Sequence, residues 1–232
     1  MIPRDAATVL IVRDDPLRVL MMRRPPTGMF ASALVFPGGA VEPSDADPDL
    51  HALVRGGEDD RVARIAGIRE TYEEVALLLG GAAPPPGATA FPDAVRTAGG
   101  LDLDVVVPIA RWVTPSIAPR RWDTRFFVAR APADHDPVPD GAEALTADWV
   151  EPAAVLAAAD AGDERLPFPT RVHLRWLALG ARTDDALARA AARTGVLVQP
   201  EVEQRDGRRW VRIPDGTDYD LTEGEVDLTL PG

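Results

Sequence analysis

A long amphipathic segment in the first third of the chain constrains the fold more than any other feature. Between residues 59 and 79, apolar side chains recur every three or four positions, which is the spacing of an α-helix with one buried face. The apolar positions are Val62, Ile65, Ile68, Tyr72, Val75 and Leu79. Successive helical residues turn by about 100°, so Glu70, Glu73 and Glu74 lie within about 100° of one another, roughly opposite the apolar side. The segment is therefore predicted to bury one face and to present three carboxylates on the other.

Segments with the pattern of β-strands lie on both sides of this helix. Two strands, at 6–13 and 17–23, precede it. The later strands are predicted at 105–113, 122–130 and 145–151, and further helices at 93–99, 152–161, 170–181 and 184–194. A candidate hairpin turns at Asp206-Gly207. Elements in this order predict an α+β or α/β sandwich, in which a mixed sheet is flanked by helices.

The composition excludes several kinds of chemistry. The 232 residues include no cysteine, and all 25 basic residues are arginine, which removes thiol nucleophiles, zinc–thiolate sites and Schiff-base lysines. The three histidines, His51, His135 and His173, do not pair at metal-ligand spacing. The net charge of −12 argues against nucleic acid as a partner, because phosphate contacts supply most of that affinity. No apolar run is long enough for a membrane helix and no signal peptide is evident, so we expect no membrane partner and a cytoplasmic location.

Two interpretations of the three glutamates stay open at this stage. They form a solvated acidic face, or they hold a divalent cation that relieves the repulsion between like charges three or four positions apart. Arg69 lies four residues before Glu73 and can form an ion pair that orients it. The Phe36-Pro37-Gly38-Gly39 segment precedes the helix, and consecutive glycines let a backbone approach a ligand closely. A small phosphorylated substrate is compatible with the negative net charge if a cation neutralises both partners.

The loop and the helix together resemble the Nudix box, the motif of the Nudix hydrolases. The box reads Gly, five residues, Glu, seven residues, then Arg-Glu-apolar-x-Glu-Glu-x-Gly-apolar. This chain has Gly39 and Asp45 in the first half, and Arg69-Glu70-Thr71-Tyr72-Glu73-Glu74-Val75-Ala76-Leu77 in the second. It departs from the box in three ways: Asp45 replaces the usual Glu, Ala76 replaces the usual Gly, and 23 residues at 46–68 replace the usual seven, an insertion of 16.

One branch of this family looks similar in carrying an insertion at this place: the peroxisomal-type coenzyme A diphosphatases and their bacterial relatives. That branch also shows a Phe-Pro-Gly-Gly loop, a Trp-x-Thr-Pro segment and an Arg-x-Asp-Thr-x-Phe-Phe strand. The corresponding residues here are 36–39, 112–115 and 121–127. The resemblance spans roughly residues 6–160. It implies a Nudix domain at 1–161 with the insertion at 46–68, followed by an extension at 162–232 that is helical and then irregular or in short strands.

The resemblance implies an α+β sandwich of Nudix type and a set of roles for individual residues. Glu70, Glu73 and Glu74 would hold Mg²⁺ or Mn²⁺, with Glu70 as the first choice for the base that activates water, and Arg69 and Glu73 would support catalysis. The other candidates are Asp45 for ordering the loop, Gly38, Gly39, Arg121 and Arg125 for binding substrate, and Glu143 as a distal ligand or base.

The implied reaction is cleavage of the diphosphate bond in a small nucleoside-diphosphate-linked molecule, with coenzyme A or an acyl-coenzyme A expected first. ADP-ribose, a dinucleotide or a nucleoside triphosphate stays open as the substrate. A Nudix-fold domain that binds a ligand without catalysis also stays open, although the intact set of three glutamates argues against it. A homodimer is compatible with the sequence, which does not predict the oligomeric state.

Overall fold

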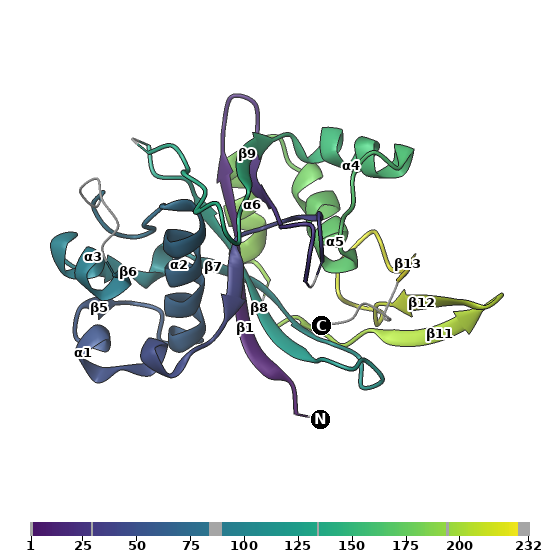
Figure 1. The fold of residues 1–232 in the computed structure, drawn as a ribbon, viewed down its shortest axis with the longest axis horizontal. Coiled ribbons are helices and arrows are strands. Elements are labelled where there is room, and N and C mark those ends of the chain that lie inside the picture. Colours follow the sequence, from purple (N-terminus) through teal and green to yellow (C-terminus); the bar gives the residue numbers. More distant parts are fainter. Residues whose placement is uncertain (1, 29, 84–89, 134, 194, 227–232) are drawn as a thin grey trace.

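A mixed β-sheet forms the centre of the molecule (Figure 1). The computed structural model describes residues 2–226 except 29, 84–89, 134 and 194. The strands are β1 (Arg4–Arg13), β2 (Arg18–Arg23), β3 (Leu34–Val35), β4 (Gly38–Ala40), β7 (Val107–Val113), β8 (Trp122–Arg130), β9 (Thr146–Val150) and β10 (Leu197–Val198). They run in the order β10-β7-β8-β1-β2-β3, with β4 paired to β1 and β9 to β2. Because β1 pairs in parallel with β8 and antiparallel with β2 and β4, the expected mixed sheet is confirmed.

The two faces of the sheet bury two separate apolar cores. Along β1, Ala7, Val9 and Ile11 pack on one face with α2 (Arg61–Val75). Leu10 and Val12 point to the opposite face and pack with α5 (Phe168–Ala178) and α6 (Thr183–Ala191), because successive side chains of a strand alternate. Figure 1 shows α2 on one side of the sheet and α5 and α6 on the other. The helices on both faces make the predicted sandwich.

The helix α2 differs from the prediction in length and in burial. It ends at Val75 rather than at residue 79, because Ala76 adopts a left-handed conformation with φ of 57°. Leu79 is nevertheless buried, beyond the end of the helix. A solvated acidic face was one of the two interpretations left open, and the helix shows it only in part: Glu74 is buried, whereas the side chain of Glu73 is 49% exposed. Protein therefore surrounds most of α2, and burial changes the electrostatics of its carboxylates.

Residues 46–68 form most of a small lobe and the first two turns of α2. The lobe contains η1 (Pro43–Ala46), α1 (Pro48–His51) and β5 (Val54–Arg55), and β5 pairs in parallel with β6 (Leu101–Asp102). Next to it lie α3 (Phe91–Thr97) and η2 (Leu103–Val105). Leu50 and Val54 belong to the same core as Ile65 of α2. Arg61 donates hydrogen bonds to three backbone carbonyls of the lobe, which ties it to the start of the helix.

The C-terminal segment is joined closely to the sheet. After α4 (Pro152–Ala161), the helices α5 and α6 cover one face and β10 extends the edge beside β7. The hairpin predicted at Asp206-Gly207 is confirmed by β11 (Glu201–Arg205) and β12 (Arg208–Arg212), and β13 (Glu223–Glu225) pairs with β12. The end of the predicted extension, 227–232, lies outside the described residues. In the part that is described, no helix combines the length and the apolar character needed to cross a bilayer.

Candidate active site

Arg69 connects the two halves of the motif through a buried network. Its guanidinium donates two hydrogen bonds to the Asp45 carboxylate, at 2.7 and 3.0 Å, and one to the carbonyl oxygen of Ala40 at 2.9 Å. It also donates to Glu70 and Glu73, each at 2.9 Å, so the expected pair with Glu73 is present. Burial alone would lower the pKa of Arg69, but the Asp45 carboxylate raises it above its ordinary value. The loop and the helix are therefore in direct contact, although 23 residues separate Asp45 from Arg69.

Two glycines bring the loop backbone against the glutamates of α2. The N–H of Gly38 donates to Oε2 of Glu74 at 2.9 Å. A Cβ on Gly38 would lie 2.3 Å from the carbonyl oxygen of Ala7, and a Cβ on Gly39 would lie 2.5 Å from the Glu70 carboxyl group. Gly38 has no room for a side chain, because its Cβ would meet backbone atoms, whereas a side chain at position 39 would displace the Glu70 carboxyl group.

Burial and mutual repulsion raise the pKa values of the glutamates beside the glycine loop. Burial raises the pKa of Glu74 to about 8; the Gly38 hydrogen bond lowers it, whereas the charges of Glu70 and Glu143 raise it. Burial also raises the pKa of Glu70, against the lowering effect of Arg69. Oε1 of Glu74 has no hydrogen-bond partner among the described residues. A buried carboxylate oxygen without a partner is costly, so a cation here would relieve both the repulsion and the lost hydrogen bond.

A cavity of about 720 Å³ opens beside these carboxylates. At this end it is lined by the two loop glycines, Glu70, Glu143 and Arg24. The carboxylate of Asp140 accepts hydrogen bonds from three successive backbone N–H groups and so holds the turn that carries Glu143. Nη2 of Arg24 lies 3.8 Å from Oε2 of Glu143, and its Nε is buried without a partner in the described part of the chain. Acidic and basic groups thus meet at one end of the cavity.

Other candidate residues lie outside the lining of this cavity. The half-exposed side chain of Glu73 is held by Arg69 at the outer side of the network. Arg121 donates to a backbone carbonyl at 3.0 Å, and Arg125 pairs with three aspartates, the nearest being Asp123 at 2.8 Å. Neither arginine lines the cavity, whereas the neighbouring Arg120 does.

The cavity also contains residues that the pattern of the sequence did not single out. Arg24 follows the end of β2 and is one of 25 arginines, so no periodicity or motif marks it. Phe168 begins α5 and reaches the cavity from the other end of the chain. Trp112 and Trp122, which belong to the two segments of the resemblance at 112–115 and 121–127, also line it.

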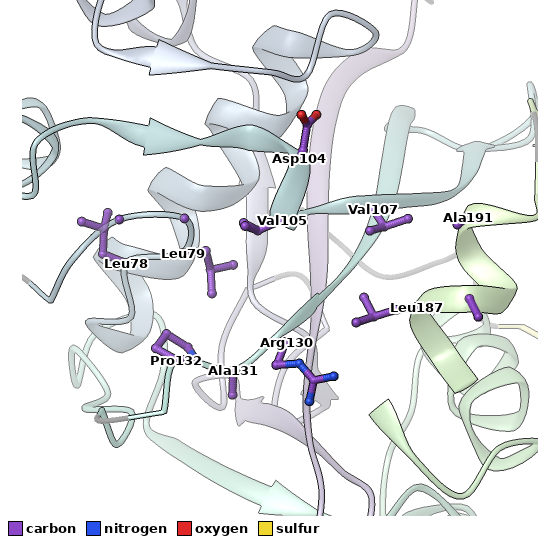
Figure 2. Close-up of a pocket in the computed structure, with 13 residues that line it drawn as sticks. Leu78, Leu79, Asp104, Val105, Val107, Arg130, Ala131, Pro132, Leu187 and Ala191 are labelled. Carbon is purple, nitrogen blue, oxygen red and sulfur yellow. The ribbon is translucent and has the colours of Figure 1, made fainter. Parts of the chain in front are cut away.

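Figure 2 shows a second cavity, of about 650 Å³. Figure 2 shows Leu78, Leu79 and Pro132 on one side of it and Leu187 of α6 on the other. Its lining is mainly aliphatic and contains none of the glutamates discussed above. We therefore place the candidate chemistry at the first cavity alone.

The donor set of the first cavity fits a hard divalent cation. Glu70 and Glu143 line the cavity and offer carboxylate oxygens, the ligand type that Mg²⁺ and Mn²⁺ prefer. Glu74 does not line the cavity, but it lies close enough for the charges of Glu70 and Glu143 to raise its pKa. Among the residues that the structure describes, no three acidic or imidazole side chains converge into a complete cation cage. Mg²⁺ commonly binds through one or two carboxylates and takes its other ligands from water and substrate phosphates. The set therefore fits a cation that the protein shares with a phosphorylated ligand.

Comparisons with known proteins agree with the fold and the motif. No family model matches the chain. A curated Nudix hydrolase of Caenorhabditis elegans is 29% identical over 182 residues, which cover 72% of this chain and 57% of that protein. The crystal structure of a Nudix hydrolase from Alicyclobacillus acidocaldarius superposes with a TM-score of 0.68 and 28% identity, covering 84% of this chain and 98% of the other. The chain thus spans little more than half the length of its curated relative.

The α+β sandwich and its loop–helix motif are those of a Nudix fold. This chain is thus similar in sequence and in fold to proteins described as Nudix hydrolases.

Proposed function

We propose that this chain is a metal-dependent pyrophosphohydrolase that cleaves the diphosphate bond of a small nucleoside-diphosphate-linked substrate. The observation that carries the proposal is the presence of Glu70 and Glu143 in the lining at the glycine end of the cavity. Their charges act on Glu74, whose buried Oε1 has no partner in the described part of the chain. Such a group of carboxylates is unfavourable by itself and becomes favourable when it binds a cation together with an anionic ligand.

Each of the residues at the site has a separate proposed role. A bound Mg²⁺ or Mn²⁺ would neutralise charge on the diphosphate and act as a Lewis acid. Glu70 lines the cavity with a raised pKa, which suits a base that takes a proton from the attacking water near neutral pH. Arg69 fixes the position of Glu70 and does not itself line the cavity. Arg24 would donate to a phosphate oxygen, because its buried Nε lacks a partner among the described residues and guanidinium groups match phosphate.

We propose coenzyme A or an acyl-coenzyme A as the substrate. The support is the resemblance of the segments 36–39 and 112–115 to the coenzyme A diphosphatase branch. In the structure both segments contribute to one cavity, through Phe36, Trp112 and Thr114 among others. ADP-ribose, dinucleotides and nucleoside triphosphates are the alternative substrates, and the same carboxylates would serve them.

The test is hydrolysis of a substrate panel by purified protein with Mg²⁺ or Mn²⁺. The panel contains coenzyme A, acetyl-coenzyme A, ADP-ribose, NADH, diadenosine polyphosphates and nucleoside triphosphates, and products are separated by chromatography. We expect coenzyme A to give an adenosine bisphosphate and 4′-phosphopantetheine. The Glu70→Gln variant should lose about 100-fold or more in kcat, which is the usual contribution of a positioned base.

A matched control is Glu58→Gln, which removes an exposed carboxylate before α2 that does not line the cavity. This variant should keep wild-type activity. If another diphosphate is cut in place of coenzyme A, the reaction class stands and the substrate is corrected. If the folded protein cuts nothing with either metal, the catalytic proposal fails and a ligand-binding domain becomes the better explanation.

A further inference from the structure

The cavity crosses the sheet from the carboxylates to a set of aromatic side chains. Ala40 of β4 pairs with Ala6 of β1, Ala6 pairs with Thr124 of β8, and Thr124 pairs with Trp112 of β7. All four residues line the cavity. Neighbouring strands lie about 4.8 Å apart, so three steps separate its two ends by about 14 Å. A ligand with its diphosphate at β4 therefore has room for an arm that extends across β1 and β8 to β7.

Residues near the end of the chain form the wall opposite these strands. This C-terminal wall consists of residues 165–170 together with Pro200, Val211, Glu225 and Val226. α2 lies on the other face of the sheet, so it cannot cover this part of the cavity. The C-terminal segment thus completes the half of the cavity that lies farther from the carboxylates.

The sheet side of this half is aromatic and held rigidly. The ring of Trp112 lies 6.2 Å from that of Phe126 and 6.3 Å from that of Phe168, in edge-on contacts. Behind them His173 stacks on Phe126 at 4.1 Å, and its two ring nitrogens bond the carbonyl oxygen of Pro169 and the hydroxyl of Tyr219. Burial lowers the pKa of His173 to about 3, so this support carries no charge at neutral pH.

The charged residues of this half lie at its rim. Arg120, Arg165 and Glu225 line the cavity and are all exposed to solvent, whereas Trp112 and Phe126 are buried. An interior of this kind favours an uncharged group and disfavours a phosphate, because an ion placed there would lose its hydration without gaining a partner.

We propose that this aromatic half of the cavity binds the uncharged, largely apolar arm of the diphosphate substrate, and that Phe168 sets the space available to it. The inference rests on the proposed function and adds to it the chemical class of the arm. It also assigns to the C-terminal wall the selection among substrates that share the same diphosphate.

Phe168 is held in place from both sides. Trp112 lies on one side, and the backbone of Gly224 in β13 lies on the other. A Cβ on Gly224 would lie 2.7 Å from two carbons of the Phe168 ring, so even a methyl group there must displace the ring. Position 224 therefore offers a way to move Phe168 without touching the carboxylates.

The test compares substrates that differ only in this arm: coenzyme A, acetyl-coenzyme A and octanoyl-coenzyme A. In Phe168→Ala the ratio of kcat/KM for octanoyl-coenzyme A to that for coenzyme A should rise about tenfold, through KM, because a pocket discriminates apolar bulk by factors of this order. In Gly224→Ala the same ratio should change by threefold or more with kcat for coenzyme A preserved. Glu201→Gln, an exposed change on β11 outside the cavity, should leave the ratio as in the wild type.

Several outcomes separate this inference from the proposed function. If the wild type hydrolyses these substrates but neither variant at 168 or 224 shifts the ratio, the inference is wrong and the reaction stands. If the wild type hydrolyses none of them, quenching of the fluorescence of Trp112 and Trp122 by octanoyl-coenzyme A still measures binding. Binding that Phe168→Ala leaves unchanged would then overturn the inference. Phe168→Leu, which keeps an apolar side chain, replaces the alanine variant if the latter does not fold.

Discussion

Replacing Glu74 by glutamine should increase the stability of the fold near neutral pH while it lowers the rate of hydrolysis. Glutamine has nearly the same shape, can still accept the hydrogen bond from the N–H of Gly38, and cannot ionise. The pKa of Glu74 in the folded protein is about 8, against an ordinary value of 4.5. Between these two values the folded protein keeps a proton that the unfolded chain has released. The wild type should therefore lose stability as the pH rises from about 5 to 8.

The magnitude follows from the linkage between protonation and folding. One retained proton changes the free energy of unfolding by about 1.4 kcal/mol per pH unit. From pH 5 to pH 7 the wild type loses about 2–3 kcal/mol that Glu74→Gln retains. In a chain of this length 1 kcal/mol shifts the Tm by about 2–4 °C. The Tm of the variant relative to the wild type should thus increase by about 5–10 °C over this range.

The assay is thermal unfolding at several pH values with a chelator present, so that no cation compensates the charge. Glu73→Gln is the control, because it makes the same chemical change on the same helix at a side chain that is 49% exposed. With the chelator at pH 8, Glu74→Gln should be the more stable protein, and with Mg²⁺ added it should nevertheless lose at least about 100-fold in hydrolysis. Parallel Tm curves for Glu74→Gln and the wild type would refute the reasoning.

Three further changes test the geometry of the site. Gly39→Ala should lower kcat at least about tenfold, because its Cβ would lie 2.5 Å from the Glu70 carboxyl group and displace it. The circular dichroism spectrum should stay unchanged, and turnover at the wild-type rate would contradict the close approach. Asp45→Asn should lower the free energy of unfolding, measured in urea, by about 3 kcal/mol, because it breaks the buried ion pair with Arg69. The matched control Asp47→Asn, at an exposed helix cap, should leave this free energy almost unchanged. Ala76→Gly should stabilise the fold by about 1 kcal/mol in the same assay, since φ of 57° favours glycine; a loss of stability would disprove this.

The elements with a strong periodic pattern could be predicted from the sequence. The strand at 122–130 and the helix at 152–161 begin and end where the alternation and the helical spacing indicated. The long helix was predicted four residues too far at its C-terminal end, because the left-handed Ala76 stops it while the apolar pattern continues in the buried residues 77–79. Periodicity indicates which side chains are buried. It does not distinguish a buried residue within a helix from a buried residue just beyond the end of that helix.

The candidate site was predictable only where its residues are local in the sequence. The placement of Glu70 and Glu74 against the glycines follows from one loop and one helix, so a motif could indicate it. Arg24 and Phe168 reach the same cavity from strands and helices that are far apart along the chain. Their proximity depends on the order of strands in the sheet and on the parallel pairing of β1 with β8, which no local pattern contains.

The lobe at 46–60 allows the long connection between Asp45 and Arg69 at almost no net cost in the free energy of folding. Closing a connection of 23 residues instead of seven costs only about 1 kcal/mol more in chain entropy. The burial of Leu50 and Val54 offsets this, since a buried aliphatic side chain contributes about 1.5–3 kcal/mol. The contact between the Asp45 carboxylate and the Arg69 guanidinium is thus compatible with a long intervening segment. A pattern of fixed spacing therefore fails to describe this motif, whereas the ion pair still defines it.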